Sequence, residues 1–130
     1  MRTERIAREI ATVAEKYPGT CANDDPSGHI DLIVPELPIP VGFTSSTARI
    51  VVRIPALYPT EKLDLFWLTP ALRRNDAGVL PNIMIEQVAL AGEMWKQISW
   101  HDNSPHDPDR ITVLGFVRGI RRWFEGQVAT

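Results

Sequence analysis

Two of the three histidines in the chain lie with three aspartates in one polar segment near its end. Residues 101–109 read His-Asp-Asn-Ser-Pro-His-Asp-Pro-Asp, so imidazoles and carboxylates occur together. His101 and His106 could bind a metal ion or transfer a proton. The spacing matches no strong zinc pattern, however, and Asp107 is explained as a helix cap. We predict no metal site, while a small metal-dependent enzyme that uses His101 and His106 stays an alternative hypothesis.

Cys21 is the only cysteine in the chain, so no internal disulfide can form. It follows Pro18-Gly19-Thr20, just after the first predicted helix. An ionised thiol is a strong nucleophile, which makes Cys21 a candidate catalytic residue. The alternative is an incidental thiol in a loop or a partly buried one, and we favour this second interpretation.

Tryptophans offer candidates for a recognition surface. Trp67 falls in a predicted strand and Trp123 in a predicted helix, so we expect both in the core. Trp95 and Trp100 fall in an irregular stretch, and tryptophan is enriched in protein interfaces. We therefore consider Trp95 and Trp100 candidate partner-binding residues, with a role in the core as the alternative.

The adjacent arginines Arg73 and Arg74 could contact an acidic partner. Arg118, Arg121 and Arg122 could do so too, but cations near a helix C-terminus are also favoured by the helix dipole. The net charge of -2 and the pI near 5.9 give no reason to expect nucleic-acid binding.

Length and composition indicate one ordinary globular domain over residues 1–130, with 44% hydrophobic and 23% charged residues. No apolar run approaches the ~20 residues that a membrane span needs. The first residues are charged and contain no continuous apolar region, so we expect no secretory signal and a cytoplasmic protein.

Helices are predicted at both ends of the chain. Ile6, Ile10, Val13 and Tyr17 share one face of a helix over residues 2–17, which Pro18-Gly19 would end. The last helix is expected to begin at Asp107 as its cap, with Pro108 in the first position, and to end near Gly126. Its apolar face would be formed by four residues, Leu114, Val117, Ile120 and Phe124.

Strands are predicted between the helices, at residues 29–34, 48–54 and 63–68. Prolines in residues 35–46 indicate an extended loop or edge strand. The near-continuous apolar run in 63–68 predicts a strand covered on both faces. Periodicity fades over residues 69–107, where we expect a long ordered loop with a short helix or turn near 89–96. The fold class is therefore α+β, an antiparallel meander with both helices packed on one face.

Several residues in a fixed order carry a resemblance to a known family. They are Leu37-Pro38, Gly42, Tyr58-Pro59, Asp64, Phe66, Pro70, Leu72, Gly78, Pro81, Trp95, Trp100-His101 and Asp109. In this order the chain resembles the bacterial family E branch of the ubiquitin-conjugating-enzyme superfamily over roughly residues 17–124. The resemblance implies the ubiquitin-conjugating-enzyme fold. Members of the branch tend to be encoded beside ubiquitin-like proteins, an activating enzyme and a JAB-type metallopeptidase.

Only some of the family's site residues have counterparts in this chain. Asn82 in Leu80-Pro81-Asn82 resembles the asparagine of the His-Pro-Asn turn, whose amide helps to stabilise an oxyanion. Leu80 stands where the histidine would be. The nucleophilic cysteine would fall within residues 90–92, which read Leu-Ala-Gly and contain no thiol. Family members carry a histidine in the region of His101, where it would act as a base or as a hydrogen-bonding brace, and we favour an anchoring role.

Thioester transfer requires a sulfur nucleophile, which the expected position lacks. We therefore predict a non-catalytic protein without a cofactor that binds a ubiquitin-like protein or its activating enzyme. The first alternative is an active conjugating enzyme that uses Cys21 or an unusual oxyester nucleophile. The second is the metal-dependent enzyme that uses His101 and His106.

Overall fold

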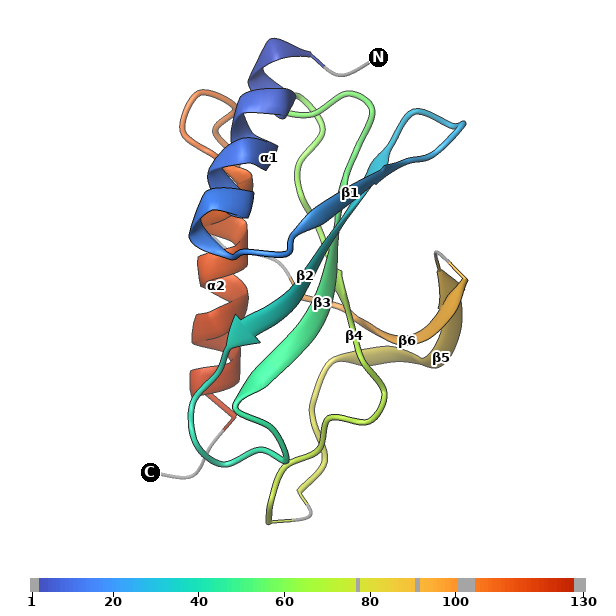
Figure 1. The fold of residues 1–130 in the computed structure, drawn as a ribbon, viewed down its shortest axis with the longest axis vertical. Helices are drawn as coiled ribbons and strands as arrows, with labels where there is room; N and C mark the ends of the chain where they lie inside the picture. Colours follow the sequence, from blue (N-terminus) through green and yellow to red (C-terminus); the bar gives the residue numbers. More distant parts are fainter. Residues whose placement is uncertain (1–2, 77, 91, 101–104, 128–130) are drawn as a thin grey trace.

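A mixed sheet-and-helix architecture is seen in the computed structural model, which describes residues 3–76, 78–90, 92–100 and 105–127. The described elements follow in the order α1 (Glu4–Lys16), β1 (Cys21–Asp24), β2 (Ile30–Pro38), β3 (Thr47–Ile54), β4 (Phe66–Leu68), β5 (Ile83–Leu90), β6 (Glu93–Ile98) and α2 (Val113–Glu125). Hydrogen-bonded neighbours in the sheet follow the order β1-β2-β3-β4-β6-β5, and every pair is antiparallel (Figure 1). The predicted α+β class is confirmed.

Both helices pack on one face of the sheet, where they enclose the main core (Figure 1). Ile6 and Val13 of α1 and Ile120 of α2 enter this core together with Phe66 and Leu68 of β4. These residues share a face because strand side chains alternate while helix side chains recur every three to four positions. Neither described helix is long and apolar enough to cross a membrane.

The predicted start of the last helix at Asp107 is wrong. The N-cap of α2 is Thr112, whose hydroxyl accepts a hydrogen bond from the Gly115 amide at 2.9 Å. Asp107 instead closes an isolated turn, in which its carboxylate accepts from the Asp109 amide at 3.0 Å. Residues 108–110 are exposed and bring no apolar side chain to the core, so packing first stabilises the helix from Val113 onward.

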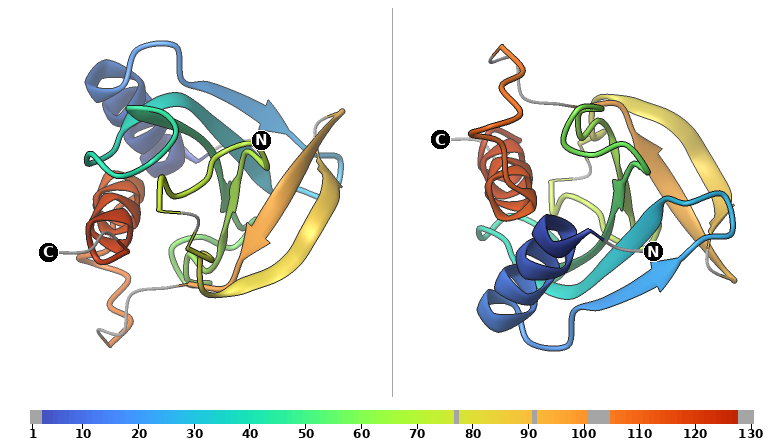
Figure 2. Two further views of the ribbon diagram at one scale, coloured as in Figure 1. Left: turned by 90° about the horizontal axis from the view of Figure 1, so that it is seen from below. Right: turned by 90° about the horizontal axis from the view of Figure 1, so that it is seen from above.

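The expected loop over residues 69–107 contains a β-hairpin. The turn that was one of the two alternatives near 89–96 is present between the two strands, whereas the described residues there form no short helix. β5 and β6 form this hairpin, and Figure 2 shows the sheet curling so that the hairpin turns away from the two helices. β5 lies at the sheet edge with mostly exposed side chains, and its register shifts twice along β6. Its sequence therefore lacks the strict alternation from which a half-buried strand is recognised.

A second, smaller core lies on the sheet face away from the helices. It consists of four buried residues, Ile33, Val51, Trp67 and Trp95. Phe66 and Leu68 of β4 face the helices and Trp67 between them faces this second core, so the strand predicted at 63–68 is covered on both faces. The strand is shorter than predicted, and residues of the β5–β6 hairpin cover its face away from the helices.

Pro35 and Pro38, which follow the first predicted strand, lie inside β2, which continues to Pro38. Pairing of β1 with β2 ends at Ile33, so the prolines lie where β2 has no neighbour on that side. The register with β3 shifts between Val34 and Leu37, as expected for a bulge near proline. Strand β1 itself was not predicted, because its four residues contain no apolar alternation.

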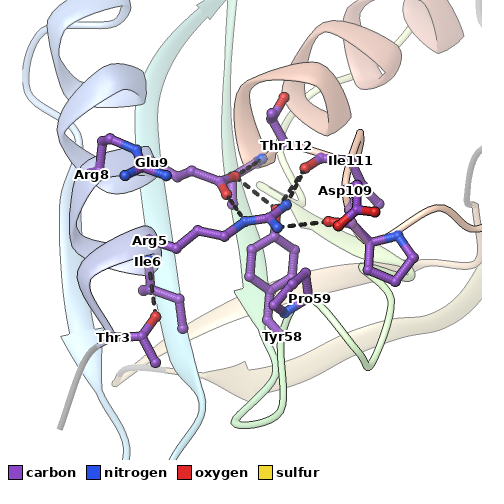
Figure 3. A network of polar contacts seen from close by, with 12 residues as sticks. Thr3, Arg5, Ile6, Arg8, Glu9, Tyr58, Pro59, Asp109, Ile111 and Thr112 are labelled. Atoms are coloured by element: carbon purple, nitrogen blue, oxygen red, sulfur yellow. Dashed lines mark hydrogen bonds and ion pairs between the residues drawn. The ribbon is translucent and has the colours of Figure 1, made fainter.

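A polar network joins the two helices to the turn at Tyr58 and Pro59 (Figure 3). One carboxylate oxygen of Glu9 accepts hydrogen bonds from the Tyr58 hydroxyl and from the Val113 amide, both at 2.7 Å. The other oxygen accepts from Arg5 at 2.7 Å, and Arg5 also donates to the Ile111 carbonyl at 2.7 Å. Glu9 thus places a negative charge at the N-terminus of α2, where the helix dipole favours it.

Candidate partner-binding site

The turn that contains Asn82 connects a buried leucine to the edge strand β5. Leu80 is buried in the main core, and Asn82 adopts a positive φ of 66°, a conformation that asparagine tolerates better than most residues. The Asn82 carbonyl accepts from the Ser99 amide at 2.7 Å, and its side-chain Oδ1 accepts from Trp123 Nε1 of α2 at 3.3 Å. The turn is therefore held from both sides, by the residue that follows β6 and by α2.

A cleft of about 200 Å³ lies beside this turn. Its apolar wall includes Leu72, Leu80 and Ile83, and its charged lining includes Arg73, Arg74, Glu86 and Lys96. Segments far apart in the sequence meet here: the loop after β4, the 80–82 turn, β5 and β6. The structure thus brings the predicted partner-binding arginines next to the turn of the predicted site residue Asn82.

The two arginines of the cleft differ in their partners. Arg74 donates two hydrogen bonds to the Asp76 carboxylate, at 3.0 and 2.6 Å, so its charge is compensated locally. Arg73 is exposed and donates to the Pro70 carbonyl at 3.4 Å, and it forms no ion pair with a carboxylate in the described part of the chain. Arg73 is the better placed of the two for an acidic partner.

Lys96 is a charged residue that lies on the core-facing side of β6. Lys96 and its neighbour Trp95 point to opposite faces of the sheet. Lys96 pairs with Leu68 of β4, and its side chain lines the cleft. Burial lowers the pKa of Lys96, the positive charge of Arg73 lowers it further, and Glu86 acts in the opposite direction. The cleft therefore contains a lysine ammonium in surroundings that disfavour its charge.

The position expected for the nucleophile lies at the tip of the β5–β6 hairpin. Leu90 ends β5 and packs against the second core, while its carbonyl accepts from Trp95 Nε1 at 3.0 Å. Gly92 adopts a positive φ of 77° in the turn, and Ala91 lies outside the described residues. No side chain in these three residues can carry an acyl group.

Cys21 lies at the opposite edge of the sheet from the Asn82 turn. It is the first residue of β1, whereas Asn82 directly precedes β5. The strand order places four strands between β1 and β5, and strands are spaced about 4.8 Å apart, so the two residues are on the order of 20 Å apart. The Cys21 thiol is exposed, but it is beyond the reach of the Asn82 amide.

The two candidate interface tryptophans are positioned by packing. Trp95 is fully buried in the second core, with the Arg49 guanidinium 4.9 Å from its ring, which is the position expected from the alternative, a role in the core. Trp100 is half-buried against the main core. Its ring lies 5.5 Å from that of Phe116 in α2, which leaves only part of its surface for a partner.

His101 lies outside the described residues, so its predicted role as a base or brace stays a prediction. His106 is exposed, and its Nε2 lies 2.9 Å from the Pro59 carbonyl oxygen, which ties the 105–111 segment to the turn at Tyr58. The described part of the chain contains no group of three His, Cys, Asp or Glu side chains placed to hold a metal ion.

Sequence reasoning missed Lys96 and Glu86 as site residues. Both lie in the hairpin that was expected to be irregular, where a lysine carries no positional information. Once β6 is recognised as a strand, the side chain of Lys96 is seen to lie on the opposite face of the sheet from Trp95 and on the same face as Ile98. A lysine at an inward position among buried residues is the signal that could have identified it.

The chain matches one family model, described as prokaryotic E2 family E, over residues 20–127. The matched residues run from the segment before β1 to the end of α2 and include the Asn82 turn and the whole cleft. No curated protein sequence and no solved structure matched the chain.

Proposed function

Because the chain belongs to prokaryotic E2 family E, we propose that it is a non-catalytic, cytoplasmic member of a bacterial ubiquitin-like modification pathway. In this proposal it binds a ubiquitin-like protein or the enzyme that activates it. The predicted family resemblance is confirmed by the match, whereas the absence of catalysis and the partner are our inference.

One observation carries the proposal: the chain matches the family model and has the asparagine turn, but it has no cysteine where the nucleophile is expected. Asn82 lies in its turn, held by Trp123 and Ser99, but residues 90–92 read Leu-Ala-Gly. An E2 enzyme holds its cargo as a thioester, and a hydrocarbon side chain cannot form one. Cys21 lies on the other edge of the sheet, which argues against its use with the Asn82 turn. A family fold that lacks the nucleophile supports a role in binding a partner protein over a role in catalysis.

Titration calorimetry tests the proposal. The purified protein would be titrated with a ubiquitin-like protein from the same genome and, separately, with an activating enzyme from that genome. We expect saturable binding to at least one of them, unchanged in the Cys21→Ser variant because the thiol is not part of the proposed surface. Lack of binding to both partners would reject the proposal.

Mass spectrometry tests the catalytic alternative in the same system. The protein would be incubated with the ubiquitin-like protein, the activating enzyme and ATP, and the intact mass recorded with and without a thiol reductant. We expect no covalent adduct. A reductant-sensitive adduct that disappears in Cys21→Ser would instead establish Cys21 as the nucleophile of an active enzyme.

A further inference from the structure

The cleft beside the Asn82 turn has an excess of positive charge. Arg73 and Lys96 line it as cations, Glu86 is the acidic residue that faces them, and the pair of Arg74 with Asp76 is neutral as a unit. The two cations are close enough for Arg73 to disfavour the charged form of Lys96. A group with one negative charge placed between them would cancel this excess.

Lys96 is a largely buried residue whose side chain lines the cleft. Its exposed fraction is 6%, and within the described ranges it makes no hydrogen bond or ion pair. Burial removes part of the hydration of the Lys96 ammonium group, and a hydrogen-bond acceptor in the cleft would replace it. An apolar side chain of similar length at position 96 would fill the same space without the free-energy cost of removing water from an ammonium group. An anionic ligand that enters the cleft would supply the acceptor that Lys96 lacks.

The size and walls of the cleft favour the end of a larger molecule. A volume of about 200 Å³ is below the range of about 300–1,000 Å³ typical of sites that enclose a whole small molecule. Val79, which lines the cleft, is 83% exposed and extends the apolar surface outward. β5, which supplies Ile83 and Glu86, is the last strand of the sheet among the described residues. An extended chain can lie beside such an edge.

We propose that this cleft binds a single peptide carboxylate, either a C-terminus or an Asp or Glu side chain, between Arg73 and Lys96. One negative charge matches the excess of one positive charge, whereas the second charge of a phosphate would meet Glu86 unpaired. The inference rests on the proposed function only for the source of the peptide, because a ubiquitin-like protein or an activating enzyme would supply it.

NMR titration of the ¹⁵N-labelled protein with short peptides tests the chemistry. The probes are acetyl-tetraalanine with a free C-terminus, the same peptide as a C-terminal amide, an amidated acetyl-Ala-Ala-Glu-Ala-Ala peptide, and inorganic phosphate. We expect the two carboxylate probes to shift the amides of Arg73, Ile83 and Lys96, and the neutral amide to shift none of them. The probe that binds more tightly identifies a C-terminus or a side chain as the source. Equal shifts with the neutral peptide, or tighter binding of phosphate, would overturn the proposal.

Three substitutions test the placement of the carboxylate. Arg73→Gln and Lys96→Met are each expected to weaken carboxylate binding about tenfold, and Glu86→Gln to tighten it severalfold by removing the opposing charge. Lys62→Gln removes an exposed lysine outside the cleft and serves as the matched control, with no change expected. Arg73 is exposed, so Arg73→Gln keeps the test decisive if Lys96→Met fails to fold. Unchanged binding in Arg73→Gln would overturn the placement.

The two proposals fail separately. Peptide carboxylates that bind in the cleft while both partner proteins fail in calorimetry would reject the proposed function and leave the cleft assignment standing. Partner binding that persists unchanged in Arg73→Gln would reject the cleft as the contact site and leave the proposed function standing.

Discussion

At the scale of single residues, Tyr58 shows how a family signature can also have a structural role. Its hydroxyl donates to Glu9, its ring lies 5.4 Å from the Arg5 guanidinium, and its side chain is buried in the main core. Burial is the largest cause that raises the pKa of Tyr58 above its ordinary value of 10.0, and the hydrogen bond to the Glu9 carboxylate acts in the same direction. A neutral phenol is therefore the form that the fold requires.

The raised pKa of Tyr58 predicts a loss of stability in alkali. The unfolded chain ionises Tyr58 near pH 10 while the folded protein keeps it neutral, so this contribution is complete below pH 10 and is lost as the pH rises above it. We expect Tyr58→Phe to be less stable by about 1–2 kcal/mol at pH 7, because Glu9 loses a donor. Its decline between pH 9 and 11.5 should be shallower than that of the wild type.

Urea unfolding across this pH range measures the difference between the two proteins. Lysines and Tyr17 are common to both, so they cancel in the comparison. Parallel stability curves for wild type and Tyr58→Phe above pH 10 would contradict the assignment of the alkaline loss to Tyr58.

At the scale of elements, α2 is shaped by the tryptophan that packs on it. A Cβ atom added to Gly119 would lie 2.7 Å from Cη2 of Trp100, closer than side-chain carbons approach one another. Glycine costs a helix about 1 kcal/mol relative to alanine. Glycine at position 119 leaves the Trp100 indole room that a Cβ atom would occupy. The contact joins the segment after β6 to α2.

Gly119→Ala is expected to destabilise the protein by about 1–3 kcal/mol, although alanine is the better helix former. The measurement is the free energy of unfolding, followed by tryptophan fluorescence and circular dichroism. Gly126→Ala is the matched control: its added Cβ meets no atom closer than 3.5 Å, and it should be neutral or stabilising. Combining Gly119→Ala with Trp100→Leu should recover part of the loss. A gain in stability for Gly119→Ala alone would show that Trp100 does not pack against α2 in solution.

At the scale of the whole molecule, one carboxylate joins three separate parts of the chain. Glu9 binds Arg5 in its own helix, Tyr58 in the turn after β3 and the first amide of α2 (Figure 3). Loss of the carboxylate would leave the Val113 amide without an acceptor and the Arg5 charge without its partner. Glu9 therefore links α1, the Tyr58 turn and the start of α2.

Glu9→Ala is therefore expected to lower the free energy of unfolding by about 3 kcal/mol, measured by urea denaturation at pH 7. Glu15→Ala removes an exposed carboxylate from the same helix and should change the stability by less than about 0.5 kcal/mol. Equal effects of the two substitutions would show that the network of Figure 3 contributes nothing specific.

The sequence by itself determined the features that repeat locally. The face of α1, the body of α2 and the strands β2 and β3 follow from apolar periodicity, because a helix or a half-buried strand must place its apolar residues on one side. The order of the residues that carry the family resemblance is also a property of the sequence, and it predicted the correct family. The absence of a thiol at residues 90–92 is also a property of the sequence alone.

Only the tertiary structure decided what the hairpin and the cleft contain. β5 is an exposed edge strand with bulges, so its residues follow no period, and the burial of Trp95 depends on a sheet that curls. Whether Asp107 or Thr112 begins α2 depends on where packing against the sheet starts. The environment of Lys96 arises from Arg73 and Glu86, which lie on other segments. Charge and burial at one residue are set by distant parts of the chain, and only the folded chain brings these parts together.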